Sequence, residues 1–270
     1  MNAARPALPV DHHVHTPLCG HAEGTLAEYV ASANGVAGVG FNDHLPFLDP
    51  ARADPVLTMA WEDLPAYLAE VQRLQGQAGI KVLLGVEADY FPGEEAAFAA
   101  ALAGTPWDYV YGSVHCVGDW GFDDSRHRGR FETADVTALY RGYYRLVAQM
   151  ARSGLFDVWA HPDLPKKFGY LPSESVEGAE REAVAAVAAA DMVMEVNTSG
   201  WRKPVGEMYP AAELLARAYE AGLPITFGSD AHRPEEVGYE FERAVALVRR
   251  AGYREYITFS RRDRIPIPLP

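Results

Sequence analysis

The sequence predicts an α/β fold built around a parallel sheet. Short runs rich in β-branched and aromatic residues alternate with amphipathic helical stretches along all 270 residues, without a linker between them. Segments that leave predicted helices are short, whereas segments that leave predicted strands are long. Alternation of this kind favours a parallel sheet that is either closed into a barrel or doubly wound. The long loops mark the carboxyl ends of the strands as the functional side of the domain.

The strands are predicted where apolar and β-branched residues cluster between turn signals. In chain order they cover residues 8–15, 36–43, 81–89, 107–115, 156–161, 192–198 and 224–230, with a last one near 256–259. The four long loops that leave strands cover residues 45–60, 116–133, 162–176 and 199–209. Seven of these strands are followed by a helical stretch, which is the pattern of repeated strand–helix units.

The helices are predicted where apolar residues recur with helical spacing. They cover residues 25–34, 61–77, 94–103, 134–153, 177–190, 210–221 and 235–251. The first begins with Thr25 followed by Glu28, the spacing of a capping box, in which each side chain bonds an amide of the first turn. A glycine that can adopt the left-handed conformation and close the last turn follows six of the helical runs: Gly35, Gly79, Gly104, Gly154, Gly222 and Gly252.

Composition and charge exclude several classes of protein. With 49% hydrophobic and 23% charged residues the chain can bury a full core, which excludes a disordered, collagen-like or coiled-coil protein. A net charge of −13 opposes binding to nucleic acid or to an anionic membrane. No apolar run approaches a membrane span, the first residues do not resemble a signal peptide, and two cysteines are too few for a disulfide framework. We therefore expect a soluble cytoplasmic protein.

Histidines gather at the predicted carboxyl ends of the strands. Seven of the nine histidines lie there, together with two carboxylates: His13, His15, His21, His44, Glu87, His115, His161, Asp230 and His232. A parallel sheet brings these strand ends to one rim, so we expect the nine side chains to converge. Strand alternation points His13 and His15 to the same side, as two ligands of one metal require.

This set of side chains predicts a multinuclear metal site. Imidazole and carboxylate ligands without thiolate favour zinc, iron or manganese. At three or four protein ligands per ion, with one carboxylate shared, the inventory fits two or three ions with open positions for water and substrate. Alternation turns His12 away, and His127 is expected to be solvated or near the substrate. We expect Cys19 and Cys116 not to be ligands or nucleophiles. Asp11 and Asp43 either orient imidazoles or bind metal.

The ordered motifs DxHxH, NDH, GVE, GSVH, AHPD and GSDAH, with the later His21, resemble those of the polymerase and histidinol phosphatase (PHP) family of metal-dependent phosphoesterases. The resemblance runs from Asp11 to His232. The segments HTPLCGHAEGT, GSVH and EVNTSGWRK are more narrowly similar to the stand-alone histidinol-phosphate phosphatases of that family. The resemblance implies a single domain over residues 1–270, with a distorted seven-stranded (β/α) barrel and three divalent ions at its carboxyl rim.

The resemblance also assigns the ligands of each ion. The first ion is expected on His13, His15, Glu87 and Asp230. Glu87 bridges to a second ion, which His115 and His161 complete. The third ion is expected on His21, His44 and His232. Zinc or iron is expected, with manganese as an alternative, and Glu87, Asp230 and His232 are expected to be catalytic as well as ligands.

The implied activity is hydrolysis of L-histidinol phosphate to L-histidinol and inorganic phosphate, a step of histidine biosynthesis. Three divalent ions would attract a phosphate to an acidic protein, and a water bridging two metals would be acidified and could attack phosphorus in line. Basic residues on two long loops are expected to bind the phosphate: Arg202 first, then Lys166 and Lys203, since arginine offers two parallel donors and lysine a point charge.

Three other functions are compatible with parts of this pattern. A phosphoesterase of the same fold could act on nucleotides or on DNA 3′ ends, but the acidic charge and the lack of a basic, aromatic-lined groove oppose it. A metal-dependent amidohydrolase also carries HxH on its first strand, but the basic pairs near the rim favour phosphate. A non-catalytic metal-binding role explains the open rim poorly. We therefore expect a small phosphomonoester as the substrate, and neither nucleic acid nor membrane as a partner.

Overall fold

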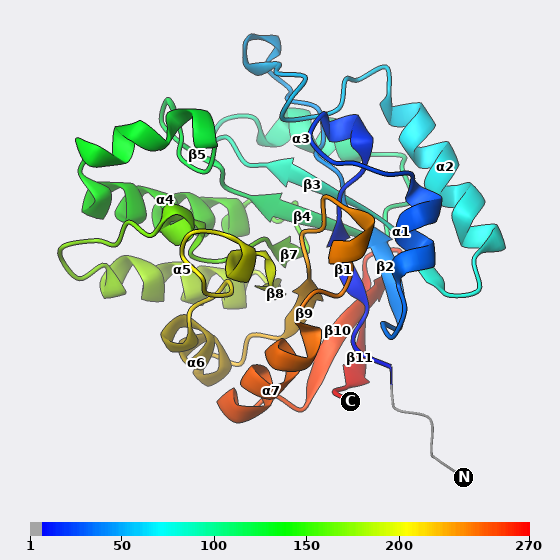
Figure 1. Cartoon of the computed structure of the whole chain (residues 1–270). Helices are drawn as coiled ribbons and strands as arrows, with labels where there is room; N and C mark the ends of the chain where they lie inside the picture. The colour runs from blue at the N-terminus through cyan, green and yellow to red at the C-terminus, as the bar shows by residue number, and fades with distance from the viewer. Residues whose placement is uncertain (1–6) are drawn as a thin grey trace.

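A parallel sheet of seven strands forms the centre of the molecule, as Figure 1 shows for the computed structural model, which describes residues 7–270. The strand order is β1-β2-β3-β4-β7-β8-β9. Their bounds are Asp11–Val14, Gly38–Phe41, Lys81–Asp89, Tyr109–Ser113, Val158–Trp159, Val193–Asn197 and Ile225–Gly228. A parallel bridge between Val14 and Ala231 brings β1 beside β9, so the sheet nearly closes into a barrel. The predicted α/β barrel with seven strands is therefore confirmed. Residues 1–6, part of the segment in which no signal peptide is expected, lie outside the described range.

Among the described residues, seven α-helices surround the sheet (Figure 1). They are α1 (Leu26–Ser32), α2 (Leu64–Gln77), α3 (Glu95–Leu102), α4 (Val136–Arg152), α5 (Glu177–Ala189), α6 (Ala212–Glu220) and α7 (Phe241–Ala251). In α4 the buried residues Tyr140, Tyr143, Tyr144 and Val147 recur at helical spacing and form the face that packs inward. The capping box of Thr25 and Glu28 is present at the start of α1. All seven predicted helices are therefore found, with shifted ends.

The structure corrects several predicted boundaries. The last helix was expected over residues 235–251, but α7 begins at Phe241, because Gly238 and Glu240 have left-handed φ values of 67° and 54° that break the helix. Gly79 does not have the left-handed φ that the other five helix-ending glycines adopt, since α2 ends at Gln77 and continues into extended backbone. Loop 116–133 contains an unexpected hairpin of β5 (Cys116–Val117) and β6 (Trp120–Gly121), followed by a 3-10 helix.

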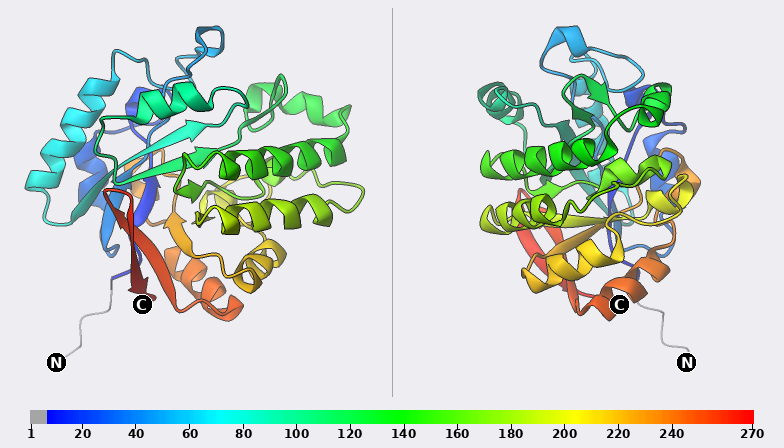
Figure 2. Two further views of the ribbon diagram at one scale, coloured as in Figure 1. Left: turned by 180° about the vertical axis from the view of Figure 1, so that it is seen from behind. Right: turned by 90° about the vertical axis from the view of Figure 1, so that its left-hand side faces the viewer.

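A carboxyl-terminal hairpin covers the amino-terminal end of the barrel (Figure 2). It consists of β10 (Glu255–Ser260), which corresponds to the predicted strand near 256–259, and β11 (Asp263–Pro268), which was not predicted. Lys81, the first residue of β3, donates from Nζ to the hydroxyl of Thr258 and to the carbonyl of Phe259. The polar end of β3 is therefore capped by this hairpin, which leaves the opposite, carboxyl-terminal end of the barrel for the functional site.

Large aromatic side chains fill the space between the strands. A Cβ atom at Gly40 would lie 2.0 Å from the hydroxyl oxygen of Tyr109, and one at Gly85 would lie 2.2 Å from its ring. Tyr109 is fully buried and donates from its hydroxyl to the carbonyl of His12, 2.7 Å away. Glycines on β2 and β3 therefore make room for a tyrosine of β4. Across residues 7–270, none of the helices combines the length and the apolar character needed to span a bilayer.

Candidate metal centre

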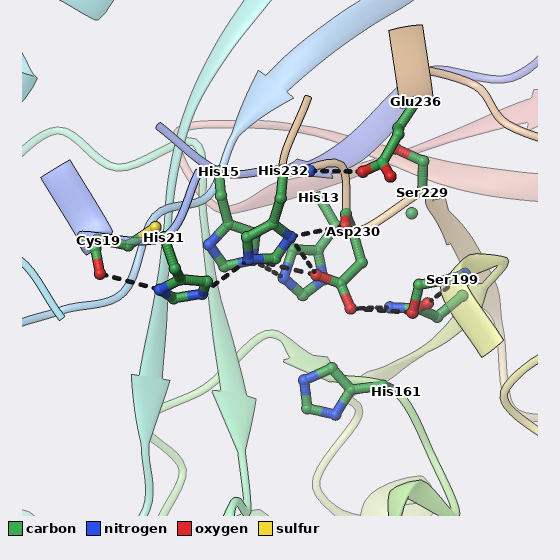
Figure 3. Close-up of polar contacts among 12 residues, drawn as sticks. His13, His15, Cys19, His21, His161, Ser199, Ser229, Asp230, His232 and Glu236 are labelled. Atoms are coloured by element: carbon green, nitrogen blue, oxygen red, sulfur yellow. Dashed lines mark hydrogen bonds and ion pairs between the residues drawn. The ribbon is translucent and has the colours of Figure 1, made fainter. Parts of the chain in front are cut away.

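The predicted ligands converge at the carboxyl ends of the strands, and Figure 3 shows the part of the cluster formed by His13, His15, His21, Asp230 and His232. His13 belongs to β1 and Glu87 to β3, whereas the other seven follow strands or lie in loops. These residues are separated by up to 219 positions in the sequence, as the numbers 13 and 232 show, yet their side chains occupy one rim. The parallel sheet therefore gathers them as predicted.

The first group surrounds the carboxylate of Glu87. Nε2 of His13 lies 3.1 Å from Nε2 of His15 and 3.2 Å from Oε2 of Glu87. The same Nε2 atom of His15 lies 3.3 Å from Oδ1 of Asp230. All four side chains are buried or nearly so. The ligand atoms of His13, His15 and Glu87 lie within 4.8 Å of one another, so one ion could contact all three.

The second group uses the other oxygen of the same carboxylate. Oε1 of Glu87 lies 2.8 Å from Nε2 of His161 and 3.5 Å from Nε2 of His115. The two imidazole nitrogens lie 3.2 Å apart. Glu87 therefore faces histidines on both of its oxygen atoms, which is the arrangement that a bridging carboxylate requires.

The third group lies at the outer side of the rim. Nε2 of His21 lies 2.9 Å from Nε2 of His232, as Figure 3 shows, and the two rings are stacked. His44 can complete this group with both of them, or join Glu87 and His115 instead. His44 is thus placed between the second and the third group.

The distances between imidazole nitrogens fit metal coordination. Three pairs of Nε2 atoms face each other at 2.9 to 3.2 Å. Two nitrogens bound to one tetrahedral zinc ion at about 2.0–2.1 Å are roughly 3.3 Å apart. Moreover, Nδ1 of His15, His44 and His161 is buried without a hydrogen-bond partner among residues 7–270. Nitrogen atoms placed in this way are better arranged to bind a cation than to form hydrogen bonds with one another, so the residues fit divalent metals.

Electrostatics favour the same conclusion. Burial opposes ionisation of Glu87, but His44 and His13 hold its pKa well below the usual value. Burial likewise opposes ionisation of Asp230, but His13, His15 and His232 together keep its pKa well below the usual value. Burial alone lowers the pKa of His13, but Glu195 and Glu87 raise it well above its usual value. The negative charge of the ionised carboxylates is thus balanced by protons on the histidines in the free chain, and divalent ions can balance it instead.

Glu195 is a functional residue that the sequence analysis missed. It lies on β8 and is fully buried. Its Oε1 lies 2.7 Å from Nδ1 of His13, and its Oε2 accepts the backbone N–H of His161 at 2.5 Å and an amide N–H of Asn197 at 3.1 Å. By fixing Nδ1 of His13, the carboxylate directs Nε2 of that ring toward the cluster. The alternation of the predicted strand 192–198 could have directed attention to Glu195, since a glutamate in a buried strand needs a partner.

The strand next to β8 leaves room for this carboxylate. A Cβ atom at Gly228 would lie 2.0 Å from Oε1 of Glu195 and 2.6 Å from Cβ of His13. His115 is held in a similar way, because its Nδ1 lies 2.7 Å from Oδ1 of Asp89. Burial lowers the pKa of His115, but Asp89, together with Asp123 and Glu87, raises it to about 10. Two of the predicted ligands therefore have a buried carboxylate behind them.

The backbone is strained at two predicted ligands. His161 has φ 25° and Asp230 has φ 54°, values that side chains other than glycine seldom adopt. Oδ2 of Asp230 accepts a hydrogen bond of 3.0 Å from the hydroxyl of Ser199 (Figure 3). Strained residues of this kind cluster at functional sites, where the surrounding structure holds them in place.

The remaining polar residues near the rim differ in their placement. Asp43 lies 3.4 Å from Nδ1 of His15, whereas Asp11 accepts from Ser229 and Gly238 and touches none of the predicted ligands except its neighbour in sequence, His13. Cys19 lies closer to the cluster than its turn position suggested, because its Sγ is within 4.8 Å of a nitrogen of His15 and of His232. Its thiol nevertheless donates to the carbonyl of Thr16.

His12 and His127 lie where they were expected. The ring of His12 contacts the hydroxyls of Thr226 and Thr258 at 2.9 Å and faces away from the cluster. The register between β1 and β2 slips between Asp11 and Val14, which shows a bulge at this point of the strand. His127 is exposed and lines the mouth of the cavity.

A cavity of about 720 Å³ opens over the cluster. The residues lining it include Lys167 and Lys203, but neither Arg202 nor Lys166, which are two of the three predicted phosphate contacts. The guanidinium of Arg202 donates to the backbone carbonyls of Ser229 and Asp230, so it braces the loop after β9.

Lys166 is buried and fully engaged within the protein. Its ammonium lies 3.0 Å from a carboxylate oxygen of Asp163 and 2.8 Å from one of Glu207, and it donates to the carbonyl of Met208. These contacts tie the loop after β7 to the loop after β8. Adjacent residues in a loop face different ways, so the role expected of Lys166 is open to its neighbour Lys167.

Comparison with known proteins identifies relatives over almost the whole chain. Residues 11–199 match the family model described as PHP domain, and residues 212–242 match the one described as PHP-associated. A probable histidinol-phosphatase from Deinococcus radiodurans is 47% identical over 260 residues, which cover 95% of this chain and 98% of that protein. The histidinol-phosphatase of Bacillus subtilis is 30% identical over 86% of this chain and 96% of its own length.

A solved structure has the same fold. The crystal structure of histidinol phosphate phosphatase from Lactococcus lactis, in complex with zinc, L-histidinol and phosphate, superimposes with a TM-score of 0.80. The match covers 95% of this chain and 98% of that one at 22% identity, a level at which the likeness establishes the fold. The family match extends over more than half of the sequence and includes β1 to β8, and from this match we conclude that the chain belongs to the PHP domain family.

Proposed function

We propose that the protein is a metal-dependent histidinol-phosphate phosphatase, which hydrolyses L-histidinol phosphate to L-histidinol and inorganic phosphate in histidine biosynthesis. The observation that carries this proposal is the convergence of seven imidazoles and two carboxylates below a cavity that also presents two lysines. The relative from Deinococcus radiodurans, 47% identical over nearly the full length, is named a probable enzyme of this activity. The barrel, the ligand set and the relatives support the same reaction.

Three divalent ions are proposed at the rim. The first would be held by His13, His15, Glu87 and Asp230, the second by Glu87, His115 and His161, and the third by His21, His44 and His232. We propose zinc or iron, because the ligands are imidazole and carboxylate and because the solved Lactococcus lactis enzyme is complexed with zinc. When bound, such ions supply Lewis-acid charge for the phosphate oxygens and lower the pKa of water.

Lys203 and Lys167 are the proposed phosphate contacts of the chain itself. Lys203 lines the cavity, and its ammonium has neither a hydrogen bond nor an ion pair within residues 7–270. The ammonium of Lys167 donates to the backbone carbonyl of Asp123 and lies 3.3 Å from its carboxylate. An unpaired ammonium at the edge of a cationic site is free to hold a dianionic phosphate, whereas Lys167 shares its charge with Asp123.

The outer part of the cavity suits an imidazole-bearing amine. Phe47 and Phe91 meet edge to face at 5.9 Å, and the guanidinium of Arg52 lies 4.1 Å above the ring of Phe91. This apolar wall can cover a flat ring. Carboxylates line the cavity around it and can attract an ammonium while repelling polyanions: Glu23, Asp54, Asp119, Asp123 and Asp124.

In this proposal the protein side chains orient the substrate. The lysines hold the phosphate over the ligand cluster, and the aromatic wall and the carboxylates hold the amino alcohol away from it. Glu195 and Asp89 keep the rings of His13 and His115 in position. This arrangement places the scissile ester between the ligand cluster and the part of the cavity that binds the amino alcohol.

The substrate experiment compares phosphate release from four compounds by the metal-loaded protein. These are L-histidinol phosphate, a nucleoside monophosphate, single-stranded DNA and p-nitrophenyl phosphate, and metal content is measured in parallel. We expect kcat/KM for histidinol phosphate to exceed the others by at least roughly 100-fold, because only this compound fills both subsites. Equal rates on histidinol phosphate and the aryl ester would contradict the substrate assignment and leave the phosphatase assignment in place.

A pair of lysine variants tests the phosphate contact. Lys203→Met should raise KM for histidinol phosphate by about 10- to 100-fold, since it removes a charge-assisted contact. Lys167→Met should have a smaller effect, because Asp123 already neutralises that ammonium. A larger loss in Lys167→Met than in Lys203→Met would reverse the assignment.

We also propose that residues 1–270 form one functional domain in the cytoplasm. The two family models match parts of one continuous sheet. The strand β8 lies in the segment matched by the first model and β9 in the segment matched by the second, and these two strands are paired. The two cysteines are unpaired, which is compatible with a reducing compartment.

A further inference from the structure

Tyr209 is held rigidly beside the cavity by its backbone. Its N–H donates to the carbonyl of Asn197 at 2.9 Å, and its carbonyl accepts the N–H of Asn197 at 2.6 Å. These two bonds form an isolated antiparallel bridge between the last residue of β8 and the end of the long loop that follows it. The position of Tyr209 is therefore fixed relative to the strand that carries Glu195.

The ring of Tyr209 is also packed on two sides. A Cβ atom at Gly200 would lie 3.1 Å from Cε2 of the ring and 2.0 Å from the carbonyl oxygen of Glu207, so the missing side chain lets this segment approach. The ammonium of Lys166 lies 5.4 Å from the ring centroid and donates to the carbonyl of Met208 next to it. With 1% of its surface exposed, the side chain has little freedom to move.

The hydroxyl of Tyr209 is the unexplained feature. It is buried, and within residues 7–270 it has no hydrogen-bond partner. Buried hydroxyls are rarely left unpaired, because they lose their bonds to water. Tyr209 also lines the cavity, together with Lys167, Lys203, Ser199 and Asp230. A fixed side chain with a free polar atom at the cavity wall is suited to contact a ligand.

The chemistry of the phenol specifies what it can offer. Burial raises the pKa of Tyr209 further above its ordinary value, and Asp163 adds to this effect. The group therefore remains a protonated, uncharged donor at neutral pH. In a cavity that two lysines also line, it complements an anionic oxygen, to which hydrogen bonds are stronger than to a neutral acceptor.

We propose that the hydroxyl of Tyr209 donates a hydrogen bond to a non-bridging phosphate oxygen of the substrate, next to the ammonium of Lys203. This inference rests on the proposed phosphatase function and adds a residue to its phosphate site. The phenol keeps its proton throughout, so it acts as a donor that binds the phosphate and not as the acid for the leaving alcohol.

The test compares the metal-loaded wild type with Tyr209→Phe, which removes only the oxygen atom. We expect inorganic phosphate, measured by calorimetry, to bind about 10- to 100-fold more weakly. The kcat/KM values for histidinol phosphate and for p-nitrophenyl phosphate should fall by the same factor, because both present the same phosphate group. Without phosphate, the melting temperature of the variant should equal or exceed that of the wild type, since the lost hydroxyl has no partner.

Tyr140→Phe is the matched control. The hydroxyl of Tyr140 donates to the carbonyl of Tyr170, and the residue does not line the cavity. This variant should lose stability and bind phosphate as the wild type does.

Three outcomes would overturn the proposal. Unchanged phosphate affinity in Tyr209→Phe would show that the hydroxyl does not contact phosphate. A loss confined to histidinol phosphate would place the hydroxyl at the leaving group or the amino alcohol. Unfolding or metal loss in the variant would reveal a structural partner. If the wild type itself showed no preference for histidinol phosphate, the substrate assignment would fail, and phosphate binding would still decide the role of Tyr209.

Discussion

Two neighbouring histidines, His12 and His13, belong to opposite ends of the same barrel. Toward the amino-terminal end, the two nitrogens of His12 each contact a threonine hydroxyl at 2.9 Å. Toward the carboxyl-terminal end, Nε2 of His13 faces Nε2 of His15 at 3.1 Å and the carboxylate of Glu87 at 3.2 Å. Both rings are fully buried, so burial does not distinguish them.

The difference lies in whether the chain supplies a matching partner. Thr226 donates to the carbonyl of Ile257 and can therefore accept from Nδ1 of His12, while Lys81 donates to Thr258. Burial lowers the pKa of His12 to about 3, so the ring is neutral and each of its nitrogens has a complementary partner. At the rim, nitrogens face nitrogens. The comparison teaches that a histidine whose partners are complete is structural, whereas histidines that face one another leave room for cations.

The largest effect is expected at the rim. Glu87→Gln should lower kcat by about 1,000-fold or more, because the residue faces both the first and the second ligand group and carries the charge between them. Metal content, measured by elemental analysis, should fall in parallel, and a chelator should inactivate the wild type. Full activity in metal-depleted protein would show that the histidines at the carboxyl-terminal rim, like His12 at the amino-terminal end, do not act as metal ligands in the reaction.

The next effect is expected at the opposite end. His12→Ala should lower the free energy of unfolding by roughly 2–4 kcal/mol, since it leaves a cavity and removes one hydrogen-bond partner from each of two buried hydroxyls. Denaturant titration measures this loss, and the metal content of the folded variant should match that of the wild type. A variant that kept its stability and lost metal would show that His12 contributes to metal binding, as the rim histidines are proposed to do.

A smaller effect is expected behind the rim. Glu195→Gln should weaken metal binding by about 10- to 100-fold, because Glu195 only accepts hydrogen bonds and the amide would turn a donor toward one of them. Competition with a chelator gives the affinity. Glu180→Gln, a buried carboxylate that pairs with Arg217 between helices, is the matched control and should bind metal normally. Equal affinities in both variants would show that Glu195 does not orient His13.

The smallest effect is expected at Lys81, at the edge of the hydrogen-bond network around His12. Lys81→Met should cost about 1 kcal/mol of unfolding free energy, since its ammonium is only partly buried and donates to Thr258 and Phe259. Denaturant titration of this variant and of its combination with His12→Ala tests the coupling. Strictly additive losses would indicate that the two residues do not share a network.

The sequence was sufficient for the positions of the strands along the chain and for the rim, because both follow from local patterns, whereas the closure of the sheet into a barrel was implied by the resemblance. Apolar runs located the seven strands of the sheet, and the histidines that follow them met as a consequence of parallel pairing. Loop conformation was not accessible in the same way. Arg202 and Lys166 are drawn into contacts with carbonyls and carboxylates that only the folded loops create. The roles of Glu195 and Tyr209 likewise depend on which neighbours the fold leaves next to them.

The bridge between Val14 and Ala231 joins segments that are 217 positions apart, from 231 − 14. Closing so long a loop is entropically unfavourable, so we expect this seam to form late in folding. His15 and Asp230 flank the seam at 3.3 Å, one on each side. An ion bound by both residues would link the amino-terminal part of the chain to the carboxyl-terminal part. Incompletely folded molecules would therefore bind this ion weakly, whereas the fully folded barrel would retain it.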